Sequence, residues 1–127
     1  MVKNMASEEI PPQLQDQLIR LQQMKSQLQM VTQQRQQVEI RLREVEQALE
    51  EVEKLKDNTP IYKSIGSLLI KAESKESVIK GLKEDKETLE LRKNTLEKQE
   101  SRLNEKLTDM QSKVENALKL SQKPQPS

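Results

Sequence analysis

Apolar residues recur every seven residues along the first half of the chain, at two positions in each repeat, with Gln, Glu and Arg between them. One position holds Leu14, Leu21, Leu28, Arg35, Leu42 and Leu49, and the other holds Gln17, Met24, Val31, Val38, Val45 and Val52. Only Arg35 and Gln17 interrupt this stripe. A heptad repeat sustained over this length predicts a coiled-coil helix. Prolines at 11 and 12 suit a first helical turn, and residues 57–60 (Asp-Asn-Thr-Pro) suit a stop, so we expect the first helix over residues 11–58.

A second repeat predicts another helix over residues 74–120, with Ser74 suited to cap its first turn. One stripe position holds Leu82, Leu89, Leu96, Leu103, Met110 and Ala117, and the other holds Ile79, Lys86, Lys93, Glu100, Leu107 and Val114. The charged residues in the second stripe can fix the register of a helix pair, or their stems can lie along the groove, which is the interpretation that we favour. Two helices of similar length with a short connector predict an antiparallel coiled coil.

The connector between the helices, residues 59–73 (TPIYKSIGSLLIKAE), gathers β-branched and aromatic residues around a lone glycine. Strands favour such residues, and Gly66 supplies the backbone freedom that a tight reversal needs. The sequence therefore predicts a β-hairpin, and the alternative is a buried loop that caps the base of the coiled coil.

A two-stranded hairpin is marginally stable in water, and its open edges promote aggregation. Because the sequence predicts no other strands, we expect hairpins of several subunits to complete one another. The predicted fold class is mainly α: a long antiparallel two-helix coiled coil with one central β-hairpin that assembles into an intersubunit β-barrel. The residues expected in this oligomerisation segment are Ile61, Tyr62, Ile65, Gly66, Leu68, Leu69 and Ile70.

Composition agrees with an elongated protein without a thick core, since 32% of the 127 residues are hydrophobic and 1% are aromatic. The formal net charge of +1 predicts no nucleic-acid partner and no membrane association. The chain has no Cys and no His, which removes the usual nucleophiles, bases and metal ligands. Its start lacks the apolar segment of a signal peptide, and no stretch has the length of a spanning helix, so we expect a cytoplasmic protein.

The order of these features resembles the prefoldin family over nearly the whole chain. The similarity lies in a helix, then TPIYKSIGSLLIKAE, then KEDKETLELRKNTLEKQE, and the single hairpin is similar to the β-type subunit. The resemblance implies a hexamer of two α-type and four β-type subunits, with a double β-barrel body and six coiled-coil tentacles. It also implies an ATP-independent chaperone without cofactors, a holdase that captures unfolded proteins near the tentacle tips and delivers them to a group II chaperonin in the cytosol.

The tips expected from this resemblance are rich in apolar residues. They comprise Ile10, Leu14, Leu18, Ile19 and Leu21 near the start of the first helix, and Met110, Val114, Ala117, Leu118 and Leu120 near the end of the second. Several lie off the heptad stripe and widen it, so we expect client contact there, although frayed ends that repack locally are the alternative. We expect a flexible N-terminus over residues 1–10 and a disordered tail over residues 121–127.

The sequence also bears on three alternatives to a chaperone. An enzyme is not expected, because the carboxylates are spread along both helices and no pocket is indicated. A coiled-coil arm that binds RNA is disfavoured by the near-zero charge and the lack of aromatic stacking residues. A coiled-coil scaffold or tether without client binding shares every helical feature and is the main alternative.

Overall fold

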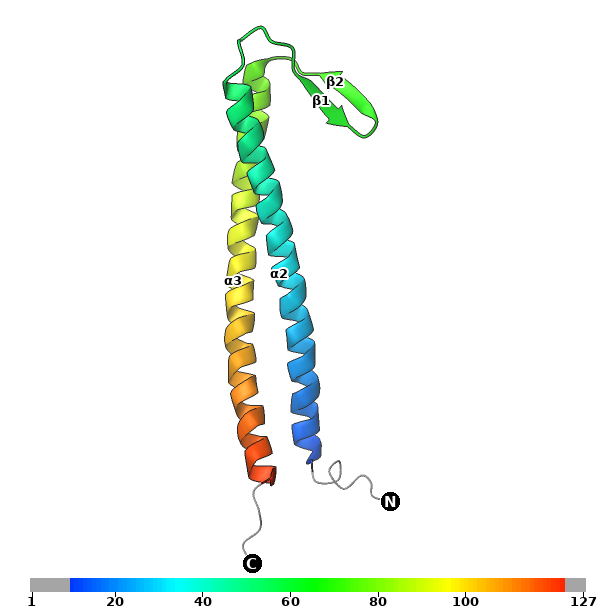
Figure 1. Cartoon of the computed structure of the whole chain (residues 1–127), viewed down its shortest axis with the longest axis vertical. Helices are drawn as coiled ribbons and strands as arrows, with labels where there is room; N and C mark the ends of the chain where they lie inside the picture. Colours follow the sequence, from blue (N-terminus) through cyan, green and yellow to red (C-terminus); the bar gives the residue numbers. More distant parts are fainter. Residues whose placement is uncertain (1–9, 123–127) are drawn as a thin grey trace, which may run out of the picture. The chain divides into compact units, whose positions relative to one another are not determined.

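A computed structural model describes residues 10–122 of the chain, and most of the expected terminal segments, 1–10 and 121–127, lies outside these residues. The elements in chain order are α2 (Pro12–Glu53), β1 (Tyr62–Ile65), β2 (Leu68–Lys71) and α3 (Lys75–Gln122) (Figure 1). Two long helices and one antiparallel hairpin confirm the mainly helical fold that the sequence predicts. The contacts divide the chain into two compact units: unit 1 contains residues 1–33 and 97–127, and unit 2 contains residues 34–96.

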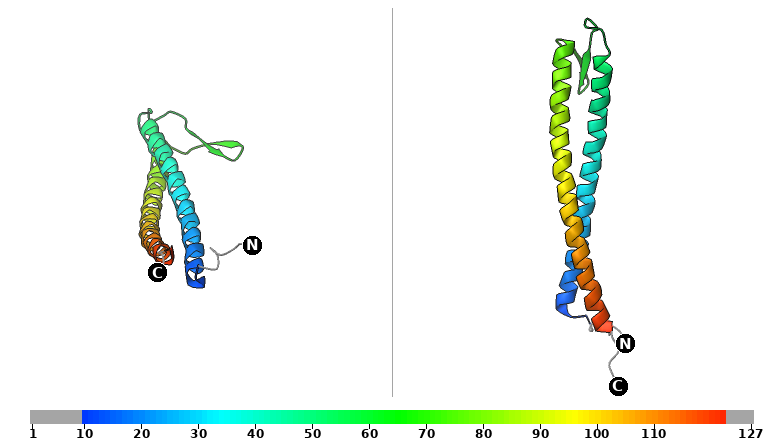
Figure 2. Two further views of the ribbon diagram at one scale, coloured as in Figure 1. Left: turned by 60° about the horizontal axis from the view of Figure 1, so that its bottom comes forward. Right: turned by 90° about the vertical axis from the view of Figure 1, so that its left-hand side faces the viewer.

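In unit 1 the first part of α2 runs antiparallel to the last part of α3, so that the start of α2 lies beside the end of α3 (Figures 1 and 2). Leu14 of α2 and Val114 of α3 are its most buried apolar side chains, 3% and 4% exposed. The other stripe positions of α2 between Leu14 and Thr32 are half-buried. Unit 1 therefore has a narrow apolar seam rather than a thick core.

In unit 2 the helices pack through a better-buried seam. The buried side chains are Val38, Leu42, Val45 and Leu49 of α2, and Val78 and Leu96 of α3. All of the heptad positions assigned from the sequence are buried or half-buried in their own unit, including those occupied by charged residues. The periodicity therefore located the seam correctly. Val78 belongs to neither predicted stripe, and its burial shows that the seam shifts near the start of α3.

Ser74 begins α3 through a reciprocal cap with Ser77. The Ser77 amide donates to Ser74 Oγ at 3.0 Å, and the Ser74 amide donates to Ser77 Oγ at 3.3 Å. The first turn of an α-helix has amides without intrahelical partners, and this cap satisfies one of them. The predicted role of Ser74 is thus confirmed.

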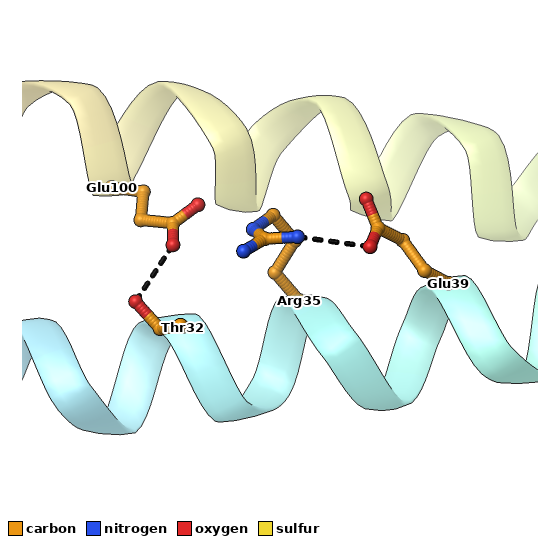
Figure 3. A network of polar contacts seen from close by, with 4 residues as sticks. All are labelled: Thr32, Arg35, Glu39 and Glu100. Atoms are coloured by element: carbon orange, nitrogen blue, oxygen red, sulfur yellow. Dashed lines mark hydrogen bonds and ion pairs between the residues drawn. The ribbon is translucent and has the colours of Figure 1, made fainter.

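Polar side chains in the seam contact the opposite helix. In unit 1 the Thr32 hydroxyl donates to Glu100 Oε2 at 2.7 Å (Figure 3). In unit 2 Lys86 Nζ lies 3.7 Å from Glu46 Oε2. Each pair joins α2 to α3. For Glu100 and Lys86 the structure therefore supports a role in fixing the register, in addition to the interpretation that we favoured, in which only the stems lie along the groove. Such contacts favour one register of an antiparallel pair.

Arg35, which interrupts the predicted stripe, has a carboxylate partner in its own helix. Its Nη1 lies 2.9 Å from Glu39 Oε1, one turn further along α2 (Figure 3). Both side chains are only about one-quarter exposed, at 21% and 28%. A guanidinium at a seam position is tolerated when a carboxylate shares its partly buried environment.

Candidate functional site

The hairpin is a short antiparallel ladder closed by a glycine turn. Tyr62 pairs with Lys71, and Ile65 pairs with Leu68 beside the turn. One further backbone bond lies beyond the strands, from the Ala72 amide to the Ile61 carbonyl at 2.8 Å. Gly66 has a φ of 60°, in the left-handed region that residues with a Cβ rarely adopt. The sequence therefore placed both strands and the turn correctly.

The two faces of the hairpin differ in chemistry. Side chains directly opposite each other in an antiparallel ladder share a face, and successive residues alternate between faces. The aliphatic face carries Lys63, Ile65, Leu68 and Ile70, and the mixed face carries Tyr62, Ser64, Leu69 and Lys71. Three branched aliphatic side chains thus gather on one side of the sheet.

Neither face of the hairpin is covered. All eight strand residues are exposed, including Leu69 at 73%, Leu68 at 62% and Tyr62 at 58%. In Figure 1 and the left view of Figure 2 the hairpin projects away from the helices of unit 2. It forms the only sheet among residues 10–122, and each strand has one edge without a neighbouring strand. Exposed apolar clusters on an open sheet are typical of a surface that another chain covers.

The structure brings together the residues expected to mediate oligomerisation. Five of them, Tyr62, Ile65, Leu68, Leu69 and Ile70, are exposed on the strands. Gly66 forms the turn, and half-buried Ile61 immediately precedes β1. The division into two faces was not anticipated from the sequence, although the alternation of side chains along each strand contains it.

A lysine that the sequence analysis overlooked joins the two helices at the base of the hairpin. Lys75 Nζ donates to the carbonyls of Leu55 at 2.7 Å and of Glu53 at 3.2 Å, and lies 3.7 Å from Asp57 Oδ1. The last turn of α2 contains no basic residue. Because helix C-termini have unpaired carbonyls and a partial negative charge, Lys75 supplies from α3 the cation and donor that α2 lacks.

The ten expected tip residues all belong to unit 1, but their exposure differs. Ile19 is 58% exposed and Leu120 is 72% exposed, whereas Leu14 and Val114 are buried in the seam. The remaining six are half-buried: Ile10, Leu18, Leu21, Met110, Ala117 and Leu118. In this conformation Ile19 and Leu120 offer the most apolar surface of the set.

No group of His, Cys, Asp and Glu side chains among residues 10–122 is arranged to hold a metal ion. The hollows on the surface lie along the helices and beside the linkers, lined largely by charged and polar side chains such as Glu97, Glu105 and Asp109. No helix in the described part of the chain has the length and apolar character needed to cross a membrane.

Residues 10–122 define a class of protein in which two antiparallel coiled-coil helices are joined by one exposed β-hairpin. Comparisons with known proteins identify the family. Residues 15–120 match the family model for a prefoldin subunit, and the chain therefore belongs to the prefoldin family.

Relatives and a solved structure place the chain near the β subunits of this family. It is 52% identical to the prefoldin subunit beta of Archaeoglobus fulgidus, over 87% of this chain and 94% of that protein. It is 47% identical to the prefoldin subunit beta of Thermococcus gammatolerans, over 88% and 95%. The crystal structure of the prefoldin beta subunit from Thermococcus strain KS-1 superposes with a TM-score of 0.78 at 43% identity, covering 91% of this chain and 97% of that one.

Family membership settles the general class of function. Prefoldin subunits are chaperones without enzymatic activity, and the β subunits form complexes with other prefoldin subunits. The sequence-based assignment to the family, and the expectation that the chain is not an enzyme, are confirmed.

Proposed function

We propose that this chain is a β-type subunit of a hexamer with two α-type and four β-type subunits, in which hairpins from neighbouring subunits complete a shared β-barrel. The exposed hairpin is the observation that carries this proposal. A two-stranded sheet with both faces and both edges open is marginally stable in water by itself, and strands of partner subunits would supply the missing neighbours. Burial of a large aliphatic side chain contributes about 1.5 to 3 kcal/mol, so a few such side chains per subunit are enough to drive association.

In the same proposal the assembled protein is an ATP-independent holdase of the cytosol. The expected tip residues, of which Ile19 and Leu120 are the most exposed, hold unfolded proteins until they pass to a group II chaperonin. Each contact is weak, but several subunits around one unfolded chain raise the effective concentration of every further contact. Weak individual contacts also permit release without a nucleotide.

The assembly part of the proposal is tested by native mass spectrometry of the chain alone and after mixing with an α-type prefoldin subunit. A complex with the mass of two α-type and four β-type chains is expected. Mixtures in which this chain stays monomeric at micromolar concentration would refute the shared barrel.

The client-binding part is tested with paired substitutions matched for exposure. Ile19→Ser with Leu120→Ser removes the two most exposed of the expected tip side chains, and Ile40→Ser with Leu91→Ser is the control in unit 2, where these side chains are 51% and 63% exposed. We expect the first double variant to assemble normally but to suppress aggregation of a denatured test protein less well, while the control resembles the wild type.

The same assay separates a chaperone from a scaffold. If the wild-type complex does not slow aggregation of the test protein, a scaffold or tether explains the fold better. Equal losses in the two double variants would show that client contact is not concentrated in unit 1.

A further inference from the structure

The hairpin carries positive charge only. Between residues 60 and 72 the charged side chains are Lys63 and Lys71, with no Asp or Glu. Both lysines are exposed, and neither has an ion-pair partner among residues 10–122. A sheet made only from copies of this hairpin would therefore gather positive charges with no carboxylate in the strands to balance them.

The two lysines lie on opposite faces of the hairpin. Lys63 of β1 pairs with Ile70 on the aliphatic face, whereas Lys71 of β2 pairs with Tyr62 on the mixed face. The aliphatic face has the larger gain from burial, because Ile65, Leu68 and Ile70 are all about half exposed or more. Covering this face brings the covering chain next to Lys63, one row from Ile65 and Leu68, while Lys71 remains on the other side.

In a symmetric assembly of identical subunits, this position of Lys63 disfavours self-association. In a closed ring of identical subunits every Lys63 lies at the same end of the shared sheet, so the ammonium groups form a ring of like charge. Like charges next to a desolvated surface repel more strongly than they do in water. A neighbouring strand with an acidic side chain at this level would instead pair with Lys63, and the stem of Lys63 would still cover apolar surface.

We propose that Lys63 makes the hairpin selective for a non-identical partner, namely a β-strand of another subunit that places an Asp or Glu beside it. This inference rests on the proposed function, because it assumes that a shared sheet covers the aliphatic face. It adds the chemistry of the partner strand and the residue that discriminates against a second copy. Lysines on edge strands are a common device against pairing of identical edges.

Self-association of the chain alone tests the proposal without any partner. Sedimentation equilibrium would compare the wild type, Lys63→Gln and the matched control Lys71→Gln, with circular dichroism to verify equal helix content. Removal of a like-charge contact should strengthen self-association of Lys63→Gln up to about fivefold, with less change for Lys71→Gln. High salt should bring the wild type toward Lys63→Gln, because it screens the repulsion.

Mixing with an α-type prefoldin subunit tests the same residue in the opposite direction. Lys63→Gln should weaken the mixed complex, Lys63→Glu should weaken it further, and Lys71→Gln should change it least. A mixed complex whose affinity and salt dependence are the same for all four proteins, or self-association that is unchanged by Lys63→Gln, would overturn the selectivity role. Absence of any mixed complex with the wild type would refute the proposed function, and the measurement on the chain alone would still decide the role of Lys63.

Discussion

Replacing Lys75 by Met should destabilise the helix pair of unit 2 at the base of the hairpin. The substitution keeps the apolar stem and removes the ammonium group, which donates to the Leu55 carbonyl at 2.7 Å and to the Glu53 carbonyl at 3.2 Å. The Lys75 side chain is 14% exposed, so water does not readily replace it. Its contact with Asp57 adds little, because that carboxylate is 85% exposed and 3.7 Å away.

The expected loss follows from these contacts. A hydrogen bond from a charged donor contributes about 1.5 to 3 kcal/mol to the free energy of unfolding. The bond to Glu53 lies in an exposed position, where water can substitute, so the bond to Leu55 dominates. We expect Lys75→Met to lower the free energy of unfolding by about 2 kcal/mol.

Urea denaturation followed by circular dichroism, at one fixed protein concentration, measures this loss. The control is Lys83→Met, which removes an exposed lysine of the same helix. Surface substitutions of this kind change stability by about 0.5 kcal/mol or less. Equal stabilities for Lys75→Met and Lys83→Met would show that the two carbonyls do not depend on the ammonium group.

Three further predictions concern the hairpin and its attachment. Ser74→Ala removes the cap of α3 and should lower the free energy of unfolding by about 1 kcal/mol in the same urea assay, and an unchanged midpoint would contradict the cap. Gly66→Val should weaken assembly with an α-type subunit more than Gly66→Asn. Open space surrounds this position, so the cost of a Cβ comes from the left-handed backbone, which Asn tolerates better than Val. Equal complex affinities of the two variants would argue against this. Ile65→Asp should abolish the complex in light scattering while helix content is kept, and Leu69→Asp on the mixed face should weaken it less; the reverse order would mean that the mixed face is the covered one.

The helices and the hairpin could be predicted because local patterns specify them. Heptad spacing depends only on the helical repeat, and every position it assigned to the seam is buried or half-buried. The strands of the hairpin are predicted by the β-branched residues around Gly66. The φ of 60° at this position explains why the residue is a glycine. These signals lie within a few residues of one another in the chain.

Features that depend on the register between distant segments could not be predicted in the same way. The Thr32 to Glu100 hydrogen bond, the contacts of Lys75 with the end of α2 and the burial of Val78 require knowledge of which turns of the two helices are adjacent. A heptad pattern is satisfied by several registers, each displaced by one repeat. The tip residues show the same limit, since Leu118 and Leu120 both lie off the stripe but Leu118 is half-buried and Leu120 is 72% exposed.

The uncovered hairpin also bears on how the amount of this subunit is controlled. Its strands have no buried side chain to hold them, so in the proposed barrel local opening would be limited mainly by contacts with other chains. By mass action, copies made in excess over their partners spend more time with the hairpin open, where proteases can cleave it. Turnover of surplus copies would then match the quantity of this subunit to that of its partners.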